Sequence, residues 1–101
     1  MTYFTQLIFI KDGQESGFHE FENIAIPAIA KYNGKLLLRI RPDEGAFIEA
    51  NMEKPYEIHL IEFNSEEDFK NFQKDEDRLK YLHLKEKSIK SSILIKGQLL
   101  S

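Results

Sequence analysis

The residues best suited to chemistry are Arg39 and Glu62, which lie in two segments of strand-like composition, residues 35–41 and 56–63. Side chains alternate between the faces of a strand, and we expect both charges to face away from the helices. A guanidinium there could hold a carboxylate or enolate through two parallel hydrogen bonds. A carboxylate in a partly dry site has a raised pKa and could move protons. The alternative is a structural Arg39–Glu62 ion pair where two copies of the chain meet, because pairing is the usual remedy for buried charge.

The histidines are the other candidates for acid–base work. His59 lies in the middle of the 56–63 strand, on the face assigned to the helices, where an imidazole could act as a general base. The alternative is a core histidine bonded to a neighbour. His19 follows Phe18 in the first predicted helix and could line the mouth of a helix–sheet pocket, or it could lie on a solvated face. Tyr32, near the end of that helix, is the second ligand-binding candidate.

The sequence has no pattern typical of a metal or cofactor site. It contains no cysteine, and its three histidines are too far apart to form a ligand pair. The five glycines are scattered and form no phosphate-binding loop. We therefore expect neither a metal nor a cofactor.

Length and charge limit the classes of function. The 101 residues fit one domain over residues 1–101, and 42% hydrophobic residues are too many for a disordered chain. The net charge of −3 argues against binding to nucleic acid or to an anionic membrane. No segment is apolar for long enough to span a bilayer, and no signal peptide is evident. Together with the lack of cysteine, this leads us to expect a cytoplasmic protein.

The predicted elements give the fold. Strands are expected over residues 3–11, 35–41, 56–63 and 91–99. Helical spacing of apolar residues precedes Asn33-Gly34, where we expect Gly34 in the left-handed conformation. A second helical region starts at Ser65 and is broken near residues 74–77. The order β-α-β-β-α-β predicts an α+β, ferredoxin-like antiparallel sheet with both helices on one face.

The opposite face of that sheet should also be apolar. Leu37, Leu60 and part of the first strand would lie on it, and so large an apolar patch usually marks an interface. The simplest cover is a second copy packed sheet to sheet with two-fold symmetry. We therefore expect a homodimer.

Two segments resemble a known family. Residues 24–39 (IAIPAIAKYNGKLLLR) resemble its helix-Pro-Gly-strand-Arg signature, and residues 58–67 (IHLIEFNSEE) resemble its strand ending in Glu-Phe followed by a helix. The family is the dimeric α/β-barrel superfamily and, within it, the domain of unknown function numbered 1330. In this resemblance Arg39 and Glu62 occupy the family's strand Arg and strand Glu positions. Ile40-Arg41 replaces the usual pair of glycines, so the likeness does not extend to a pocket built there.

The resemblance implies two ferredoxin-like units whose sheets form a shared barrel. The superfamily includes cofactor-independent monooxygenases, lactone isomerases and haem-degrading enzymes, whose ligand histidine lies on the helix corresponding to that of His83. We favour a small homodimeric binding or accessory module for a small molecule. The alternative is a cofactor-independent monooxygenase or isomerase for a small oxygenated compound, in which Arg39 orients the substrate and His59 or Glu62 moves a proton. Whether the chain is an enzyme stays open at this point.

Overall fold

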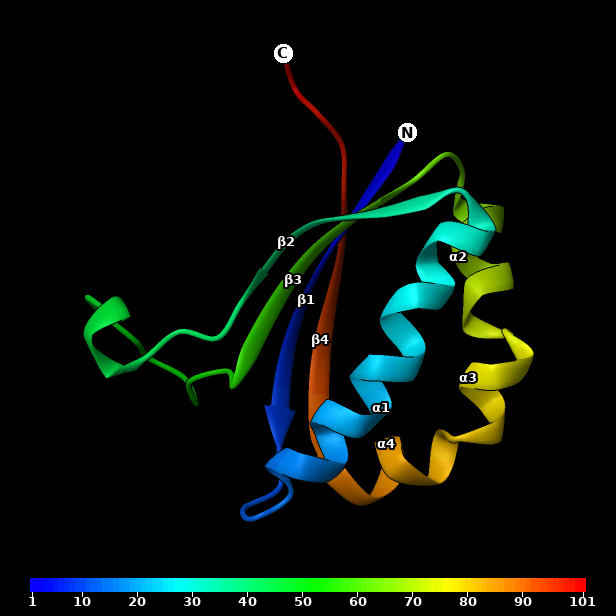
Figure 1. Ribbon diagram of the computed structural model, residues 1–101. Helices are drawn as coiled ribbons and strands as arrows, with labels where there is room; N and C mark the ends of the chain where they lie inside the picture. The colour runs from blue at the N-terminus through cyan, green and yellow to red at the C-terminus, as the bar shows by residue number, and fades with distance from the viewer.

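The computed structural model describes all of residues 1–101. Along the chain the elements are β1 (Thr2–Ile10), α1 (Glu15–Ala28), the 3₁₀ helix η1 (Ile29–Tyr32), β2 (Gly34–Ile40), the 3₁₀ helix η2 (Glu44–Ala46), β3 (Glu57–Phe63), α2 (Glu66–Gln73), α3 (Glu76–Lys80), α4 (Leu82–Ser88) and β4 (Ile89–Gly97). All four predicted strands are present. Figure 1 shows them as one layer with the α-helices on one side, while the segment between β2 and β3 projects from the other side.

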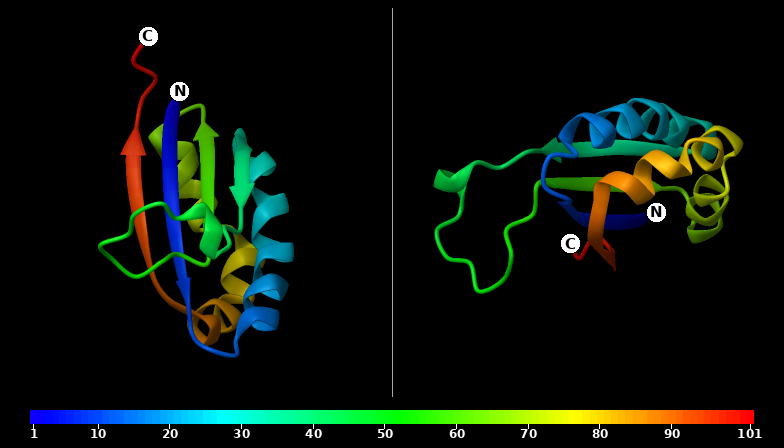
Figure 2. Two further views of the ribbon diagram at one scale, coloured as in Figure 1. Left: turned by 90° about the vertical axis from the view of Figure 1, so that its left-hand side faces the viewer. Right: turned by 90° about the horizontal axis from the view of Figure 1, so that it is seen from below.

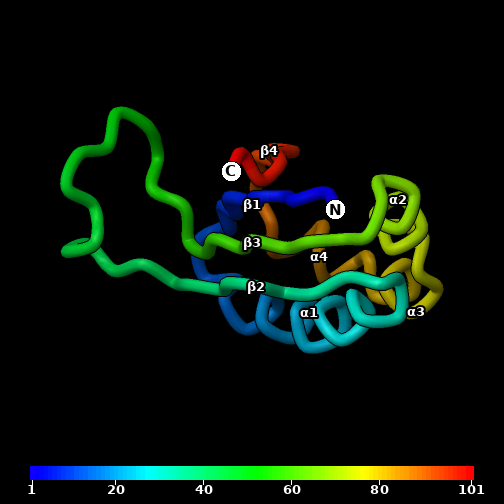
Figure 3. Tube along the Cα trace, turned by 90° about the horizontal axis from the view of Figure 1, so that it is seen from above, coloured from blue at the N-terminus to red at the C-terminus, as the bar shows by residue number.

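The sheet has the order β2-β3-β1-β4, and every neighbouring pair is antiparallel. Figure 2 shows this order across the sheet, and Figure 3 shows the β2–β3 segment reaching beyond its end. Each β-α-β crossover skips one strand, which is the ferredoxin-like arrangement. The fold class predicted from the order of the elements is confirmed.

The core lies between the sheet and the helices. Along β3, Glu57, His59, Ile61 and Phe63 are buried and the residues between them are half-exposed, as expected for a strand with one covered face. Phe63 packs edge to face against Phe4 of β1, with ring centroids 6.2 Å apart. The alternation predicted for this strand is confirmed, and it places a glutamate and a histidine inside the core.

The turn between η1 and β2 corrects one expectation. Asn33, with φ of 60°, takes the left-handed conformation, whereas we expected Gly34 to take it. Asparagine tolerates this region better than most residues. Gly34 is needed for a different reason: a Cβ there would lie 2.5 Å from a ring carbon of Phe63 and 2.6 Å from the Cγ2 atom of Ile29. Close packing of β2 on the core therefore requires the glycine.

A bulge in β2 overturns the predicted direction of Arg39. The β2–β3 register shifts between Leu36 and Leu38, so Leu38 lies opposite Leu60 and Arg39 lies opposite His59. One extra residue reverses the alternation that follows it. The expectation that Arg39 faces away from the helices is therefore wrong, and so is the proposed Arg39–Glu62 pair.

The second helical region consists of α2, α3 and α4. The Ser65 hydroxyl accepts a hydrogen bond from the backbone N–H of Asp68, 3.1 Å away, and so caps α2 as predicted. The predicted break occurs at Lys74 and Asp75, and the Asp75 carboxylate caps α3. The helices of the structure are too short or too polar to cross a membrane.

The face of the sheet away from the helices, here called the outer face, is apolar and uncovered. Leu38 and Ile40 of β2 are 47% and 40% exposed, and Ile93 and Ile95 of β4 are 40% and 51% exposed. Their partners in register on β3 and β1 include Leu60 and other aliphatic side chains. A small chain on its own rarely leaves such a patch in water.

Candidate functional site

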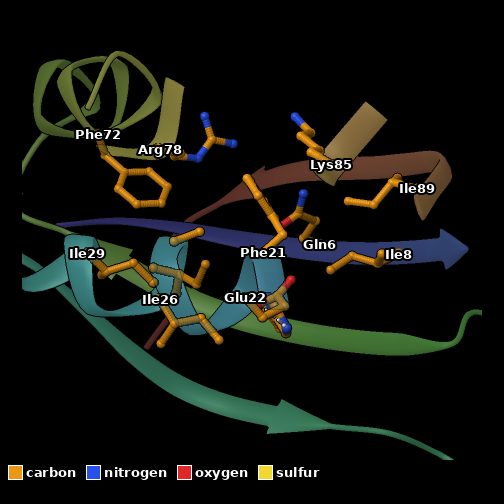
Figure 4. Close-up of a pocket in the computed structure, with 13 residues that line it drawn as sticks. Gln6, Ile8, Phe21, Glu22, Ile26, Ile29, Phe72, Arg78, Lys85 and Ile89 are labelled. Carbon is orange, nitrogen blue, oxygen red and sulfur yellow. Dashed lines mark ion pairs between the residues drawn. The ribbon is translucent and has the colours of Figure 1, made fainter. Parts of the chain in front are cut away.

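A small pocket lies between the helices and the sheet, and we call it the helix–sheet pocket. Its volume is about 40 Å³, and its walls come from α1, β1, β3 and the start of β4. Most of the lining is apolar, including Ile26, Ile29 and Phe72. Figure 4 shows the polar side chains on its margins: Glu22 on one side, and Arg78 and Lys85 on the other.

Beside Glu22 lies an ion cluster, here called the Glu57 cluster, in which the partly exposed Arg39 and Arg41 meet the buried Glu57 and His59. Arg39 donates from Nε to Glu57 Oε2 over 3.0 Å, and Arg41 donates from its terminal nitrogen to Oε1 over 2.7 Å. His59 Nε2 lies 2.5 Å from Glu57 Oε2. Glu57 is only 1% exposed. Burial by itself raises the pKa of Glu57, but the bonds from His59, Arg41 and Arg39 outweigh it and hold this pKa at about 2.

Glu22 is the second buried carboxyl group, and no hydrogen bond satisfies it. It lies on the inner side of α1 with its Oε2 atom 3.8 Å from His59 Nε2. Desolvation raises the pKa of Glu22 to about 7, while the nearby His59 opposes the shift and Glu57 adds to it. A carboxyl group in this state can give up or take a proton near neutral pH.

Glu22, Glu57 and His59 can also be considered as possible ligands of a metal ion. Ligand atoms of Glu22, Glu57 and His59 lie within 4.8 Å of one another. However, both Glu57 oxygens already accept bonds from Arg39 or Arg41. A cation among them would face two guanidinium groups and would have to displace their bonds. The arrangement fits an acid–base cluster better than a metal centre.

Arg78 and Lys85 form the opposite margin of the pocket, and we call them the cationic pair. Arg78 extends over the ring of Phe72, with its guanidinium carbon 5.1 Å from the ring centroid, and donates to the Gln73 carbonyl over 3.1 Å. Its Nε atom is buried and has no acceptor. Neither Arg78 nor Lys85 makes an ion pair in the structure, although every other arginine has a carboxylate partner.

A second cavity of about 120 Å³ adjoins the cationic pair. Phe72, Ile61 and Gln6 line both cavities together with the two cations, while Phe69 and Leu94 line only the larger one. The helix–sheet pocket therefore continues past Arg78 and Lys85 toward β4. The two spaces together give a small, mainly apolar site with an acid–base group on one margin and unpaired positive charge on the other.

The structure brings together only part of the predicted site. His59 and Arg39 meet in the Glu57 cluster, and His59 lines the pocket. Glu62 lies opposite Lys35 and Tyr3 in the register, on the outer face and away from the pocket. Its catalytic role, like those of Arg39 and His59, stays a prediction.

The other predicted residues lie elsewhere. His19 Nε2 is 2.7 Å from the hydroxyl of Tyr56, and Tyr32 donates to the Asp75 carboxylate over 2.9 Å. Neither lines the helix–sheet pocket, so their ligand-binding roles also stay predictions. His83 is exposed on α4, with its ring 6.2 Å from that of Tyr81.

Sequence reasoning missed Glu22, Glu57 and the cationic pair. A signal existed for the two glutamates: Glu57 is two residues from His59 on one strand face, and Glu22 is four residues after Phe18 on the apolar helix face. No comparable signal existed for Arg78 and Lys85. They belong to different short helices, whose relative placement the sequence does not reveal.

Comparison with known proteins supports the fold. No family model matches the chain, and no curated protein matches it. Among solved structures, a protein of unknown function from Rhodopseudomonas palustris superposes with a TM-score of 0.82 at 13% identity, covering 99% of this chain and 82% of that one. A NIPSNAP family protein with unknown function from Agrobacterium tumefaciens gives 0.69 at 16% identity, covering 96% and 86%.

A third structure, a candidate antibiotic biosynthesis monooxygenase from Nitrosomonas europaea, gives a TM-score of 0.74 at 10% identity and covers both chains completely. Identities this low show the fold alone. The chain thus has the ferredoxin-like α+β fold of the dimeric α/β-barrel proteins. The activity has to be argued from its own residues.

Proposed function

We propose that this protein is a homodimer of the dimeric α/β-barrel type that binds a small molecule in the helix–sheet pocket and the adjoining cavity of each protomer. The observation that carries the proposal is the pocket itself: apolar walls with a buried, unbonded Glu22 on one margin and unpaired Arg78 and Lys85 on the other. Unpaired polar groups in a core are costly unless they serve a ligand. Affiliation with the domain of unknown function numbered 1330, and a cytoplasmic location, belong to this proposal on sequence grounds alone.

Binding can be tested by blocking the pocket. Ala25 lies in its wall and is buried, whereas Ala30 is exposed on η1. Ala25→Leu should remove most ligand-detected NMR signals from a library of small oxygenated compounds, and Ala30→Leu should leave them unchanged. Equal signals from both variants would show that the compounds bind elsewhere, and no signal from the wild type would contradict the proposal.

The homodimer is supported by the outer face. Its aliphatic side chains lie on all four strands, and burying them against a second copy would remove their apolar area from water at about 25 cal/mol per Å². The β2–β3 segment projects on the same side and leaves Ile48 fully exposed and Met52 half-exposed. It is placed to contact the partner.

A charge on the outer face should separate the protomers. Leu38→Asp should convert a dimer at micromolar concentration to a monomer in sedimentation velocity. Leu79→Asp is the matched control, because Leu79 is similarly exposed but lies on α3. A wild-type chain that is folded and monomeric under these conditions would rule out the dimer.

A second candidate function is catalysis of a proton shift, as in an isomerase. The specific observation is that Glu22 lines an apolar pocket with His59 beside it, where burial raises the pKa of Glu22 to about 7. Glu22 would take a proton from the carbon next to a carbonyl group and return it two carbons further along the chain while the double bond moves between them, with no net oxidation. His59 lies beside the Glu22 carboxylate before and after the proton transfer; between the two steps Glu22 is neutral, and the negative charge lies on the enolate form of the substrate. Glu62 could act only in a site shared with the partner protomer.

Proton exchange is measured directly in deuterated water. The wild type should accelerate deuterium incorporation into small unsaturated lactones, and Glu22→Gln should abolish the acceleration. Glu20→Gln, an exposed position on the same helix, should have no effect. Equal background exchange in all three proteins would eliminate the enzymatic candidate and leave the binding function.

A further inference from the structure

We propose that the ligand is a small organic monoanion, such as a carboxylate on a compact apolar body, whose negative group binds between Arg78 and Lys85, across the pocket from Glu22. This inference rests on the proposed binding function and names the class of ligand. It follows from the contrast between the two ends of the pocket, from the free hydrogen-bond donors, and from the size of the adjoining cavity.

Arg78 provides a donor that is ready for an acceptor. Its guanidinium is held between the rings of Phe72 and Phe21, with the guanidinium carbon 5.1 Å and 5.9 Å from the ring centroids. One terminal nitrogen is bound to the Gln73 carbonyl, and the buried Nε has no partner. A fixed guanidinium with a free N–H matches the geometry of a carboxylate oxygen.

Lys85 adds a second positive charge to the same space. It lines both the helix–sheet pocket and the adjoining cavity, and its ammonium group makes no hydrogen bond or ion pair. Burial lowers the pKa of Lys85, and the neighbouring charge of Arg78 lowers it further. Figure 4 shows the two side chains side by side on one margin of the pocket. Glu22 and Asp75 act on Arg78, and Glu86 acts on Lys85, only at distances beyond an ion pair. Two neighbouring cations without a direct ion pair attract an anion.

The walls limit the ligand's size and character. The adjoining cavity measures about 120 Å³ and is lined by Phe4, Phe69, Phe72 and Leu94, among others. A cavity of roughly 150 Å³ holds a benzene molecule. The body of the ligand is therefore about the size of one ring or a short branched chain. A single negative charge suits the pair best, because the nearby Asp75 carboxylate already offsets part of the charge of Arg78.

The charge balance of the pocket couples anion binding to a proton. The groups that face Glu22 are His59 and Glu57 from β3, Arg39 from β2 and Arg78 from α3. Glu57 is already neutralised by its own arginines, and Lys85 lines the pocket beyond Arg78. An anion at the cationic pair removes the positive charge that favours ionised Glu22. Binding should therefore require protonated Glu22, and the affinity should fall above pH 7.

The experiment compares carboxylates from isobutyrate to benzoate with the amides of the same skeletons, using isothermal titration calorimetry with the full chain. The carboxylates should bind and the amides should bind at least tenfold more weakly. Lys85→Gln should weaken carboxylate binding about tenfold or more, while the matched control Lys87→Gln, exposed on the same helix, should bind as the wild type does. Circular dichroism confirms that each variant is folded.

The pH profile distinguishes the coupling from simple charge attraction. Between pH 7 and 8.5 the wild-type affinity should fall by up to about tenfold per pH unit, and Glu22→Gln should make the profile flat. Amides that bind as tightly as carboxylates would overturn the anion inference but keep the binding pocket. Failure of both classes to bind would overturn the inference and the proposed function together.

Discussion

The two ends of the helix–sheet pocket differ in whether their positively charged side chains have carboxylate partners. In the Glu57 cluster, two arginines and a histidine converge on one buried carboxylate that accepts from all three. In the cationic pair, Arg78 and Lys85 are half-buried, and no carboxylate forms an ion pair with either side chain. Glu22 lies between the two ends and belongs to neither.

This difference in charge pairing distinguishes a structural role from a ligand-binding role. A buried charge with a complete set of partners stabilises the native state as long as every partner is present. A buried charge without partners costs stability, and natural proteins tolerate such a cost mainly at functional sites. We therefore assign a structural role to the Glu57 cluster, which fixes β2 on β3, and a ligand-binding role to the cationic pair.

The largest effect is expected from Glu57→Gln. This change leaves Arg39 and Arg41 without their shared counterion and should lower the free energy of unfolding by about 3–5 kcal/mol. Urea denaturation at pH 7 measures it. Glu53→Gln, which breaks the exposed pair with Lys90, should cost less than about 1 kcal/mol. Similar losses in the two variants would remove the distinction between the cluster and a surface ion pair.

Between pH 4.5 and 8 the wild type should lose about 3 kcal/mol of its free energy of unfolding through Glu22, and Glu22→Gln should remove this loss. The pKa of Glu22 is raised from 4.5 to about 7, so the native state holds a proton that the unfolded chain releases. The contribution of Glu22 to the free energy of unfolding is therefore fully present below pH 4.5 and is lost as the pH rises through 7. The variant should therefore be more stable than the wild type at pH 8 and show little gain at pH 4.5.

Thermal unfolding from pH 4.5 to 8 provides the measurement. Glu57 should show the opposite sign, because its pKa is lowered to about 2 and its contribution is lost as the pH falls below 4.5. A Glu22→Gln variant whose stability falls with pH as steeply as that of the wild type would show that Glu22 is ionised in the core throughout.

The smallest effect is expected from Lys85→Met. Replacing a desolvated, unpaired ammonium group with an apolar side chain should leave stability unchanged or raise it by about 1 kcal/mol. Lys87→Met on the same helix should change it by less than about 0.5 kcal/mol. A clear loss of stability in Lys85→Met would mean that the charge is structural, and the contrast between the two ends of the pocket would fail.

Local rules predicted most of the fold. The strand ends, the Ser65 cap and the helix break near Asp75 follow from residue type and spacing within a few neighbours, so they were accessible without a structure. The left-handed residue was misplaced by one position: Asn33 takes this conformation, while position 34 needs glycine because of its close packing on Phe63, which is distant in the chain.

The site was predictable only in part. The alternation along β3 correctly placed His59 beneath the helices, but the bulge at Leu36–Leu38 turned Arg39 to the same side. A bulge depends on how two strands pair, and a single strand's pattern does not show it. The position of the bulge therefore determines which carboxylate forms an ion pair with Arg39.

By itself, the sequence determined the order of strands and helices and the two faces of β3, since these depend on side-chain periodicity along one segment. The bulge in β2 decided that Leu38 and Ile40 lie on the outer face. Tertiary structure alone decided that Arg39 and Arg41 share Glu57, and that Arg78 and Lys85 line one cavity without a counterion. The physical reason is that charge pairing depends on distances between elements, and those distances exist only after the helices have packed on the sheet.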